Sequence, residues 1–200
     1  KVADDPSVLV FTETTSNLYN KRFVNSIDNL IFNLTEEEFT SLQPDILLTF
    51  GGMIVSKKIK KFLRDYSPKE HWHVNELRAF DTYQVLSKHL KIDSHSFFKH
   101  FCELVDYDNK STYESTWTYY KQRIREKHNH YIKTAPYSDL KVFEQVLKVI
   151  PDFSEVQFSN SAIIRYSQLF EMNSTITVFC NRGTSGIDGS TSTALGAAYA

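Results

Sequence analysis

The segment NRGTSGIDG at 181–189 carries a glycine at every third position, between a predicted strand and a predicted helix. Glycines at this spacing favour an open loop ahead of the helix. Arg182 gives the loop a fixed positive charge. No GK[ST] follows, and the segment does not match GxGxxG, so neither of these phosphate-binding motifs is present. The pattern favours a different kind of anion site.

A similar arrangement lies earlier in the chain, in the segment SNSAIIR at 159–165. Asn160 is predicted to cap a helix, Ser161 to place a hydroxyl in its first turn, and Arg165 to follow on the same face. If the two preceding strands are parallel neighbours, Arg165 and Arg182 both lie at the carboxyl edge of the sheet, where open α/β folds bind ligands. Two guanidinium groups there favour recognition of carboxylates or phosphates. The alternative is two structural arginines that cap loops.

A third candidate follows the predicted strand at 45–50, where a Gly-Gly turn leads to a helix capped by Ser56. A strand, a glycine turn and a helix N-terminus together form an anion site, because unpaired N–H groups and the helix dipole favour negative charge. Lys57 is nearest the turn, and we assign it to this site. A solvated helix face explains the other lysines of the helix equally well: Lys58, Lys60 and Lys61.

Composition excludes several function classes. The chain of 200 residues has 23 basic and 24 acidic side chains, so it lacks the basic excess of most nucleic-acid-binding domains. No stretch approaches the roughly 18 apolar residues of a membrane span, and the first residues lack the pattern of a signal peptide. Cys102 and Cys180 lie far apart and form no CxxC, which fits a reducing cytosol.

The seven histidines do not predict a metal site. His71 and His73 could share one face of a strand, but no histidine pairs with a carboxylate at a spacing typical of metal ligands. We therefore expect surface or structural histidines.

The elements that would position these residues alternate between strand and helix. Thr35 with Glu38 predicts a capping box for a short helix before Pro44. Buried-type strands are predicted at 8–11 and 45–50, and further strands at 71–74 and 86–92. This order predicts a doubly wound α/β fold with a mostly parallel sheet.

A polar, helical stretch from 94 to about 133 is predicted to form a connecting arm, closed by Pro136. Ser138 is predicted to cap the next helix, and strands at 155–158 and 175–179 are followed by helices from 160 and 190. We place a central Rossmann-like α/β domain with its arm at 1–135 and part of a second α/β domain at 136–200.

Together these motifs resemble one family, the SEPHCHC synthases, which are thiamine-diphosphate enzymes of menaquinone biosynthesis. The resemblance depends first on 181–189, continued by Ser192-Thr193-Ala194 and Gly196. It is supported by Ser159-Asn160-Ser161 with Arg165, by the turn from Phe50 to Lys57, and by the opening segment ETTSN at 13–17. It covers essentially the whole chain but only part of the enzyme. It implies most of the central domain followed by the first half of the pyrophosphate-binding domain.

The resemblance also implies roles for single residues. Ser161, Arg165 and Arg182 look like the family's substrate-binding residues, and Lys57 looks like its central-domain lysine. For the cofactor, Ile187 resembles the apolar wedge under thiamine diphosphate, Gly186 lies with its backbone beside the aminopyrimidine ring, and Asn160 belongs to the same site. Without the resemblance, Ile187 could simply fill the domain core.

The activity implied for the full-length enzyme is decarboxylation of 2-oxoglutarate on thiamine diphosphate and addition of the resulting carbanion to isochorismate. The catalytic glutamate of an N-terminal domain and the GDG-to-Asn segment that holds Mg²⁺ lie outside this sequence; the GIDG at 186–189 is not that segment. The isolated 200-residue chain is therefore expected to be inactive and to contain no catalytic residue or metal ligand. The full-length enzyme is expected to be cytoplasmic, without nucleic-acid partners or a membrane span, and a homodimer or homotetramer.

A second hypothesis stays open from the residues alone. Composition and element order allow a non-catalytic anion- or nucleotide-binding α/β module with a regulatory role. A GDG motif with a following Asn, within a few dozen residues after Ala200, would favour the enzyme.

Overall fold

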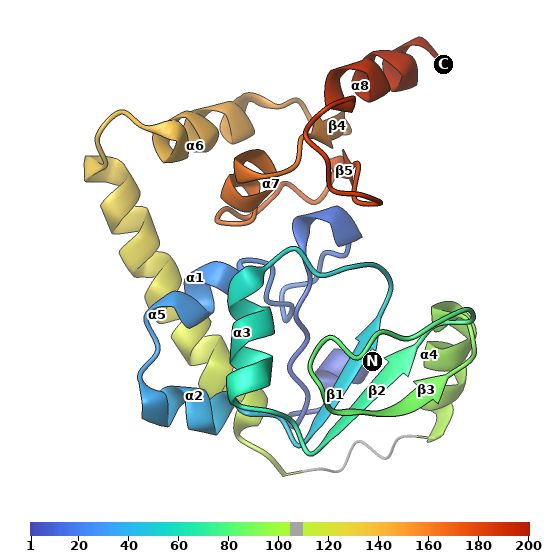
Figure 1. The fold of residues 1–200 in the computed structure, drawn as a ribbon. Helices are drawn as coiled ribbons and strands as arrows, with labels where there is room; N and C mark the ends of the chain where they lie inside the picture. The colour runs from blue at the N-terminus through green and yellow to red at the C-terminus, as the bar shows by residue number, and fades with distance from the viewer. Residues whose placement is uncertain (105–109) are drawn as a thin grey trace. The chain divides into compact units, whose positions relative to one another are not determined.

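The computed structural model describes residues 1–104 and 110–200 (Figure 1). Contacts between Cα atoms divide the chain into two compact units. The first unit comprises Lys1–Leu9 and Ile31–Tyr120, and the second comprises Val10–Leu30 and Lys121–Ala200. The helices α1 (Ile27–Phe32) and α5 (Tyr113–Thr134) each contribute residues to both units.

A three-stranded parallel sheet forms the centre of the first unit. Strands β1 (Ile46–Phe50), β2 (Glu70–Val74) and β3 (Leu86–Leu90) lie in the order β1-β2-β3. Helices α3 (Lys57–Asp65) and α4 (Ser94–Leu104) flank this sheet (Figure 1). The prediction of a parallel α/β arrangement is confirmed, although the connection from β2 to β3 contains no helix.

The helices of the first unit begin where their capping residues predict. The capping box joins Thr35 and Glu38 at the start of α2 (Glu36–Leu42), and the Ser56 hydroxyl accepts a hydrogen bond from the Ile59 N–H at 3.1 Å. Helix α3 turns its apolar face inward, and the Phe62 ring stacks on that of Phe39 with centroids 5.4 Å apart. A short 3-10 helix, Val2–Asp4, completes the unit's regular structure among the described residues.

A pair of parallel strands, β4 (Glu155–Phe158) and β5 (Thr177–Cys180), carries the second unit. Its helices include α6 (Asp139–Val149), α7 (Ala162–Ser167) and α8 (Ser190–Tyr199). The segment 10–30, with a 3-10 helix at Thr14–Ser16, packs on β5, where the Asn17 carboxamide pairs with both the N–H and the C=O of Val178 at 2.7 and 2.9 Å.

Three predicted elements differ from the structure. The predicted strand at 8–11 is reduced to one parallel bridge between Phe11 and Val24. Within the described residues, no strand continues the pairing on either side of this bridge. The predicted helical arm at 94–133 is two helices, α4 and α5, and its residues 105–109 lie outside the described residues. Helix α7 begins at Ala162 rather than at Asn160, with Ser161 in the capping position.

Helix α5 ends at Thr134 and α6 begins at Asp139, on either side of the predicted domain boundary. The domain limits themselves stay a prediction. Of the helices in the described parts of the chain, none combines the length and apolar character needed to cross a membrane.

Candidate functional site

The carboxyl ends of β4 and β5 lie level with each other, since Phe158 pairs with Cys180 in parallel register. The residues that follow the two strands therefore leave the sheet from the same edge. This is the arrangement on which the anion site was predicted, and it brings Asn160 and Arg182 into direct contact.

Asn160 is the centre of this edge. It is 1% exposed, and its Nδ2 donates hydrogen bonds to the backbone oxygens of Asn181 and Gly186, both at 2.7 Å. Its Oδ1 accepts from Nη1 of Arg182 at 2.6 Å and from Sγ of Cys180 at 3.3 Å. The predicted capping role of Asn160 is therefore wrong: its side chain joins a second loop about twenty positions further along the chain.

The Arg182 guanidinium is only partly engaged by the protein. Nη1 bonds to Asn160, while Nε is buried without a hydrogen-bond partner among the described residues. Burial raises the pKa of the neighbouring Cys180 thiol, and the positive charge of Arg182 acts in the opposite direction. An arginine that bonds to the protein through one of its five N–H groups has donors left for a carboxylate or phosphate.

Ser161 is the residue before α7, and Arg165 lies within this helix. Ser161 has φ 63° and ψ −122°, a conformation that non-glycine residues rarely adopt and that costs about 1–3 kcal/mol. Its side chain is exposed and makes no capping hydrogen bond. Arg165 lies half-buried in the last turn of α7 and forms no hydrogen bond or ion pair with the described residues. Both polar groups are available to a ligand.

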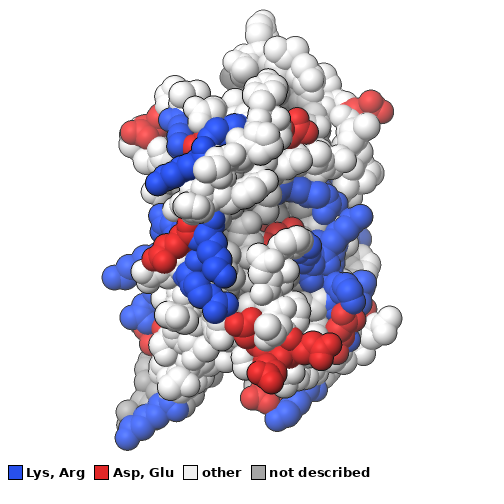
Figure 2. Space-filling model, turned by 90° about the vertical axis from the view of Figure 1, so that its left-hand side faces the viewer, with Lys and Arg blue, Asp and Glu red and all other residues white. Residues whose placement is uncertain are grey.

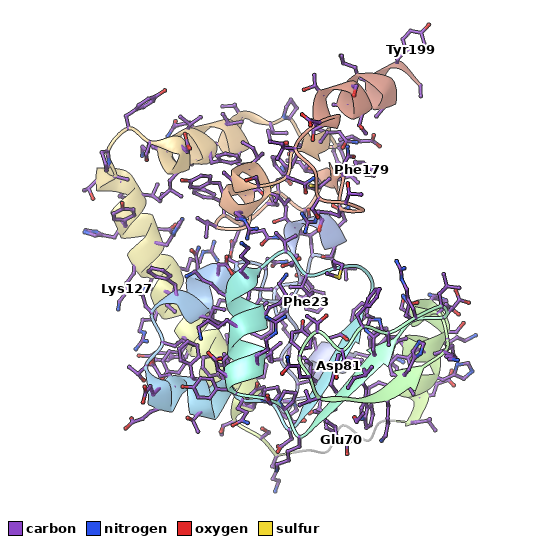
Figure 3. The ribbon with its side chains drawn as sticks, viewed as in Figure 1. Phe23, Glu70, Asp81, Lys127, Phe179 and Tyr199 are labelled. Atoms are coloured by element: carbon purple, nitrogen blue, oxygen red, sulfur yellow. The ribbon has the colours of Figure 1, made fainter. Side chains whose placement is uncertain are left out.

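The glycine-rich loop exposes an apolar side chain. Ile187 is 67% exposed, so within the second unit it does not fill the core. Gly189 ends the loop with φ 78°, a backbone conformation that favours glycine, and caps α8. Beyond it α8 carries further exposed apolar residues, and Tyr199 is 96% exposed at its end (Figure 3).

Lys57 belongs to the first unit, where it is exposed in the first turn of α3. The other lysines of this helix have partners: Lys58 lies over the Phe32 ring at 4.2 Å, Lys60 donates to the Ile54 carbonyl at 3.0 Å, and Lys61 pairs with Asp65. Among the described residues Lys57 has no hydrogen bond or ion pair. Lys57 thus differs from its neighbours, and its assignment to an anion site stays a prediction.

On the face seen in Figure 2, basic and acidic side chains are interspersed, which agrees with the near balance of charge in the sequence.

The spacing of the histidines along the sequence did not predict the histidine cluster in the first unit. The Thr49 hydroxyl lies 2.7 Å from Nε2 of His71 and 2.8 Å from Nδ1 of His73, and the His89 ring is 6.4 Å from that of His73. Burial lowers the pKa of both His71 and His73. The spacing of His71 and His73 indicated that they share one face of β2. Their hydrogen-bond partner, Thr49, comes from β1, which spacing along a single strand does not indicate. No group of three or more potential ligands in the described residues could hold a metal ion.

Comparison with known proteins adds two findings. The family described as the middle domain of thiamine pyrophosphate matches residues 9–156. A Flavobacterium psychrophilum protein is 50% identical over the whole chain, which covers 36% of that relative. A Flavobacterium johnsoniae protein is 50% identical over 98% of the chain, covering 35% of the relative, and a Bacteroides thetaiotaomicron protein is 37% identical over 86%, covering 30%.

All three relatives carry the name 2-succinyl-5-enolpyruvyl-6-hydroxy-3-cyclohexene-1-carboxylate synthase, which is abbreviated SEPHCHC synthase. The chain spans about a third of the length of these curated relatives.

Proposed function

Since the chain belongs to the middle-domain family of thiamine pyrophosphate enzymes, we propose that it is part of a SEPHCHC synthase of menaquinone biosynthesis. The reaction joins 2-oxoglutarate, after loss of carbon dioxide, to isochorismate. The observation that carries this proposal is the edge of β4 and β5, where Arg182 is anchored next to an open loop of the family's type. Thiamine diphosphate would supply the electron sink for the decarboxylation.

Substrate binding is the task of the cationic side chains. Both substrates are polyanionic, so the site needs fixed positive charges that match carboxylates. Among the described residues, the guanidinium of Arg182 bonds to the protein only through Nη1, and a guanidinium with further donors can bind a carboxylate. Arg165 and the Ser161 hydroxyl, which make no competing contacts, would complete this binding edge.

Lys57 is the candidate substrate-binding residue within the first unit. Its lack of a partner in the described residues supports this role, because an unpaired ammonium can be neutralised by a bound carboxylate. Its place in the first turn of α3 adds the favourable end of the helix dipole.

One observation supports a cofactor role for the loop 181–189. The exposed Ile187 side chain offers an apolar surface on which a thiamine ring can pack, with the Gly186 backbone beside it. We propose Mg²⁺ as the ion that accompanies the diphosphate, with ligands from residues outside this sequence. The remaining expectations, a cytoplasmic enzyme that forms a homodimer or homotetramer, belong to the same proposal.

The test is an assay of the full-length protein that contains this sequence. With thiamine diphosphate, Mg²⁺, 2-oxoglutarate and isochorismate, we expect SEPHCHC formation and release of carbon dioxide. Omitting isochorismate should abolish the product. If the protein binds carboxylates but forms no product under these conditions, the non-catalytic anion-binding module is the correct interpretation.

A further inference from the structure

We propose that Asn160 is a positioning residue, whose carboxamide fixes the Arg182 guanidinium and holds the loop 181–186 at both ends. This inference rests on the proposed function, from which Arg182 takes its role as a substrate-binding residue. It assigns to Asn160 an action through other groups rather than a direct contact with cofactor or substrate.

The orientation of the carboxamide follows from its partners. The backbone oxygens of Asn181 and Gly186 can only accept hydrogen bonds, so the Nδ2 amide group must face them, at 2.7 Å each. Oδ1 is then left to face the donors, Arg182 Nη1 at 2.6 Å and Cys180 Sγ at 3.3 Å. Both N–H groups and both lone pairs of the carboxamide are occupied. No polar capacity remains for a direct bond to a ligand.

Burial makes these contacts effective. Asn160 is 1% exposed, and hydrogen bonds to a charged group in such a site are stronger than in water. A long arginine side chain loses much rotamer freedom when it binds a ligand. The bond from Nη1 to Asn160 fixes the guanidinium before the substrate arrives, so less entropy is lost on binding.

The loop needs the same support. It contains Gly183 and Gly186, both exposed, and Ser185 with φ 57°, so its backbone has little structure of its own. The two bonds from Nδ2 reach the residue before Arg182 and the glycine before Ile187. One side chain therefore sets the position of a proposed substrate-binding residue and of the proposed cofactor wedge.

A double-mutant cycle in the full-length enzyme tests whether Asn160 acts through Arg182. We expect Asn160→Ala to lower kcat/KM about tenfold, as for loss of a charge-assisted hydrogen bond. In an Arg182→Ala background the same change should cost less, because the guanidinium being positioned is already gone and only the loss through the loop remains. An equal loss in both backgrounds would overturn the proposal.

Asn160→Asp keeps the acceptor for Arg182 but turns a carboxylate oxygen toward the two backbone oxygens. We expect it to remain impaired, because the loop loses its ties. Full activity of this variant would overturn the role of Asn160 in holding the loop. If Asn160→Ala does not fold, the cycle is run with Asn160→Leu, which keeps the branched shape of the side chain and removes the acceptor for Arg182.

Tryptic cleavage after Arg182 gives a measurement that does not need the reaction. Freeing the loop should accelerate cleavage of the Arg182–Gly183 bond about fivefold or more in Asn160→Ala. The matched control is Asn173→Ala, which also removes carboxamide hydrogen bonds in the second unit, to Asp152 and from the Thr175 N–H, but leaves β5 and the loop tied. Equal cleavage in both variants would count against the inference. A wild-type protein that forms no SEPHCHC would refute the proposed function alone, since cleavage still tests the loop.

Discussion

At the scale of single residues, the distinction that matters is between cations held by the fold and cations left for a ligand. Lys58, Lys60 and Lys61 each have a partner within the first unit. Arg182 has one anchored and one buried, unpaired nitrogen, and Arg165 makes no hydrogen bond or ion pair with the described residues. The candidate substrate residues are therefore recognisable by their unused donors.

Replacing either arginine by alanine should impair catalysis in the full-length enzyme. A charge-assisted contact is worth roughly 1.5–3 kcal/mol, so Arg165→Ala and Arg182→Ala should each lower kcat/KM about ten- to a hundredfold, with little change in Tm. Arg165→Lys should recover only part of the loss, because the charge remains but the planar donor group does not. Steady-state kinetics measures these effects.

Lys58→Ala is the control for this series. Its ammonium lies over the Phe32 ring on an exposed helix face, so its removal should leave kcat/KM nearly unchanged. An Arg182→Ala enzyme with wild-type kcat/KM for both substrates would show that Arg182 is not part of the site.

Sequence spacing predicted which residues meet at this edge but not how they bond. Parallel strands bring Asn160 and Arg182 together, and both strands were predicted from the alternation of strands and helices. The capping rule then failed for Asn160, because that rule considers only the residues of one helix. Bonds to a loop about twenty positions away took precedence, and a sequence contains no local signal for them.

At the scale of elements, strands and caps differ in how far they could be predicted. The capping box at α2 and the Ser56 cap at α3 depend on residues three apart, and both were predicted correctly. The strand expected at 8–11 was not, although its composition suits a buried strand. A strand needs a neighbouring strand as the hydrogen-bond partner of its N–H and C=O groups. The composition of a segment does not show whether such a neighbour is present.

The capping box of α2 should contribute measurably to stability. Thr35→Ala removes the hydroxyl that accepts from the Glu38 N–H at 3.2 Å, and we expect a loss of about 1 kcal/mol in unfolding free energy. Thr40→Ala is the control, because its hydroxyl bonds only to a carbonyl of its own helix. Urea unfolding of the two variants should separate them, and equal stabilities would contradict the capping role.

The histidine cluster between β1 and β2 should make the stability of the first unit depend on pH. Burial, followed by the charge of His73, lowers the pKa of His71, while Asp81 acts in the opposite direction; burial and then His89 lower that of His73. His71 is 0% exposed and its Nδ1 has no partner among the described residues. The folded state therefore binds fewer protons than the unfolded state below a pH of about 6.5.

We expect the unfolding free energy to be at its full value above pH about 6.5 and to fall as the pH drops toward the lowered pKa values. His71→Gln, which retains a polar group near Nε2 and does not titrate, should flatten this decrease. His100→Gln, at an exposed helical position, should leave the decrease unchanged. Urea unfolding of the two variants and the wild type between pH 7.5 and 5 measures this pH dependence. If the unfolding free energy falls as steeply in His71→Gln as in the wild type, the histidine cluster does not cause the decrease.

At the scale of the whole molecule, the compact units do not follow the order of the chain. Residues 10–30 belong with 121–200, while the residues before and after them belong to the first unit. Hydrophobic periodicity reports local structure and cannot reveal that an early segment packs on a late strand. The domain limits at 1–135 and 136–200, which were predicted from the order of elements along the chain, stay a prediction.

The junction between segment 10–30 and β5 should be a main source of stability for the second unit. Asn17 donates to the Val178 carbonyl at 2.9 Å and accepts from its N–H at 2.7 Å, and Tyr19 donates to the Ile176 carbonyl at 3.1 Å. Asn17 also has φ 52°, a conformation that asparagine tolerates better than alanine.

Asn17→Ala removes two hydrogen bonds and adds backbone strain, so we expect it to lower the unfolding free energy by about 2–3 kcal/mol. Tyr19→Phe removes one hydrogen bond and should lower it by about 1 kcal/mol. Asn20→Ala is the matched control, because Asn20 makes only a local bond to the Arg22 N–H on the surface. Native-state hydrogen exchange of the β5 amides should report the same order, since the loss acts on this strand directly. If Asn17→Ala were no less stable than Asn20→Ala, segment 10–30 would contribute little to holding β5, and contacts from 121–200 would have to account for that strand.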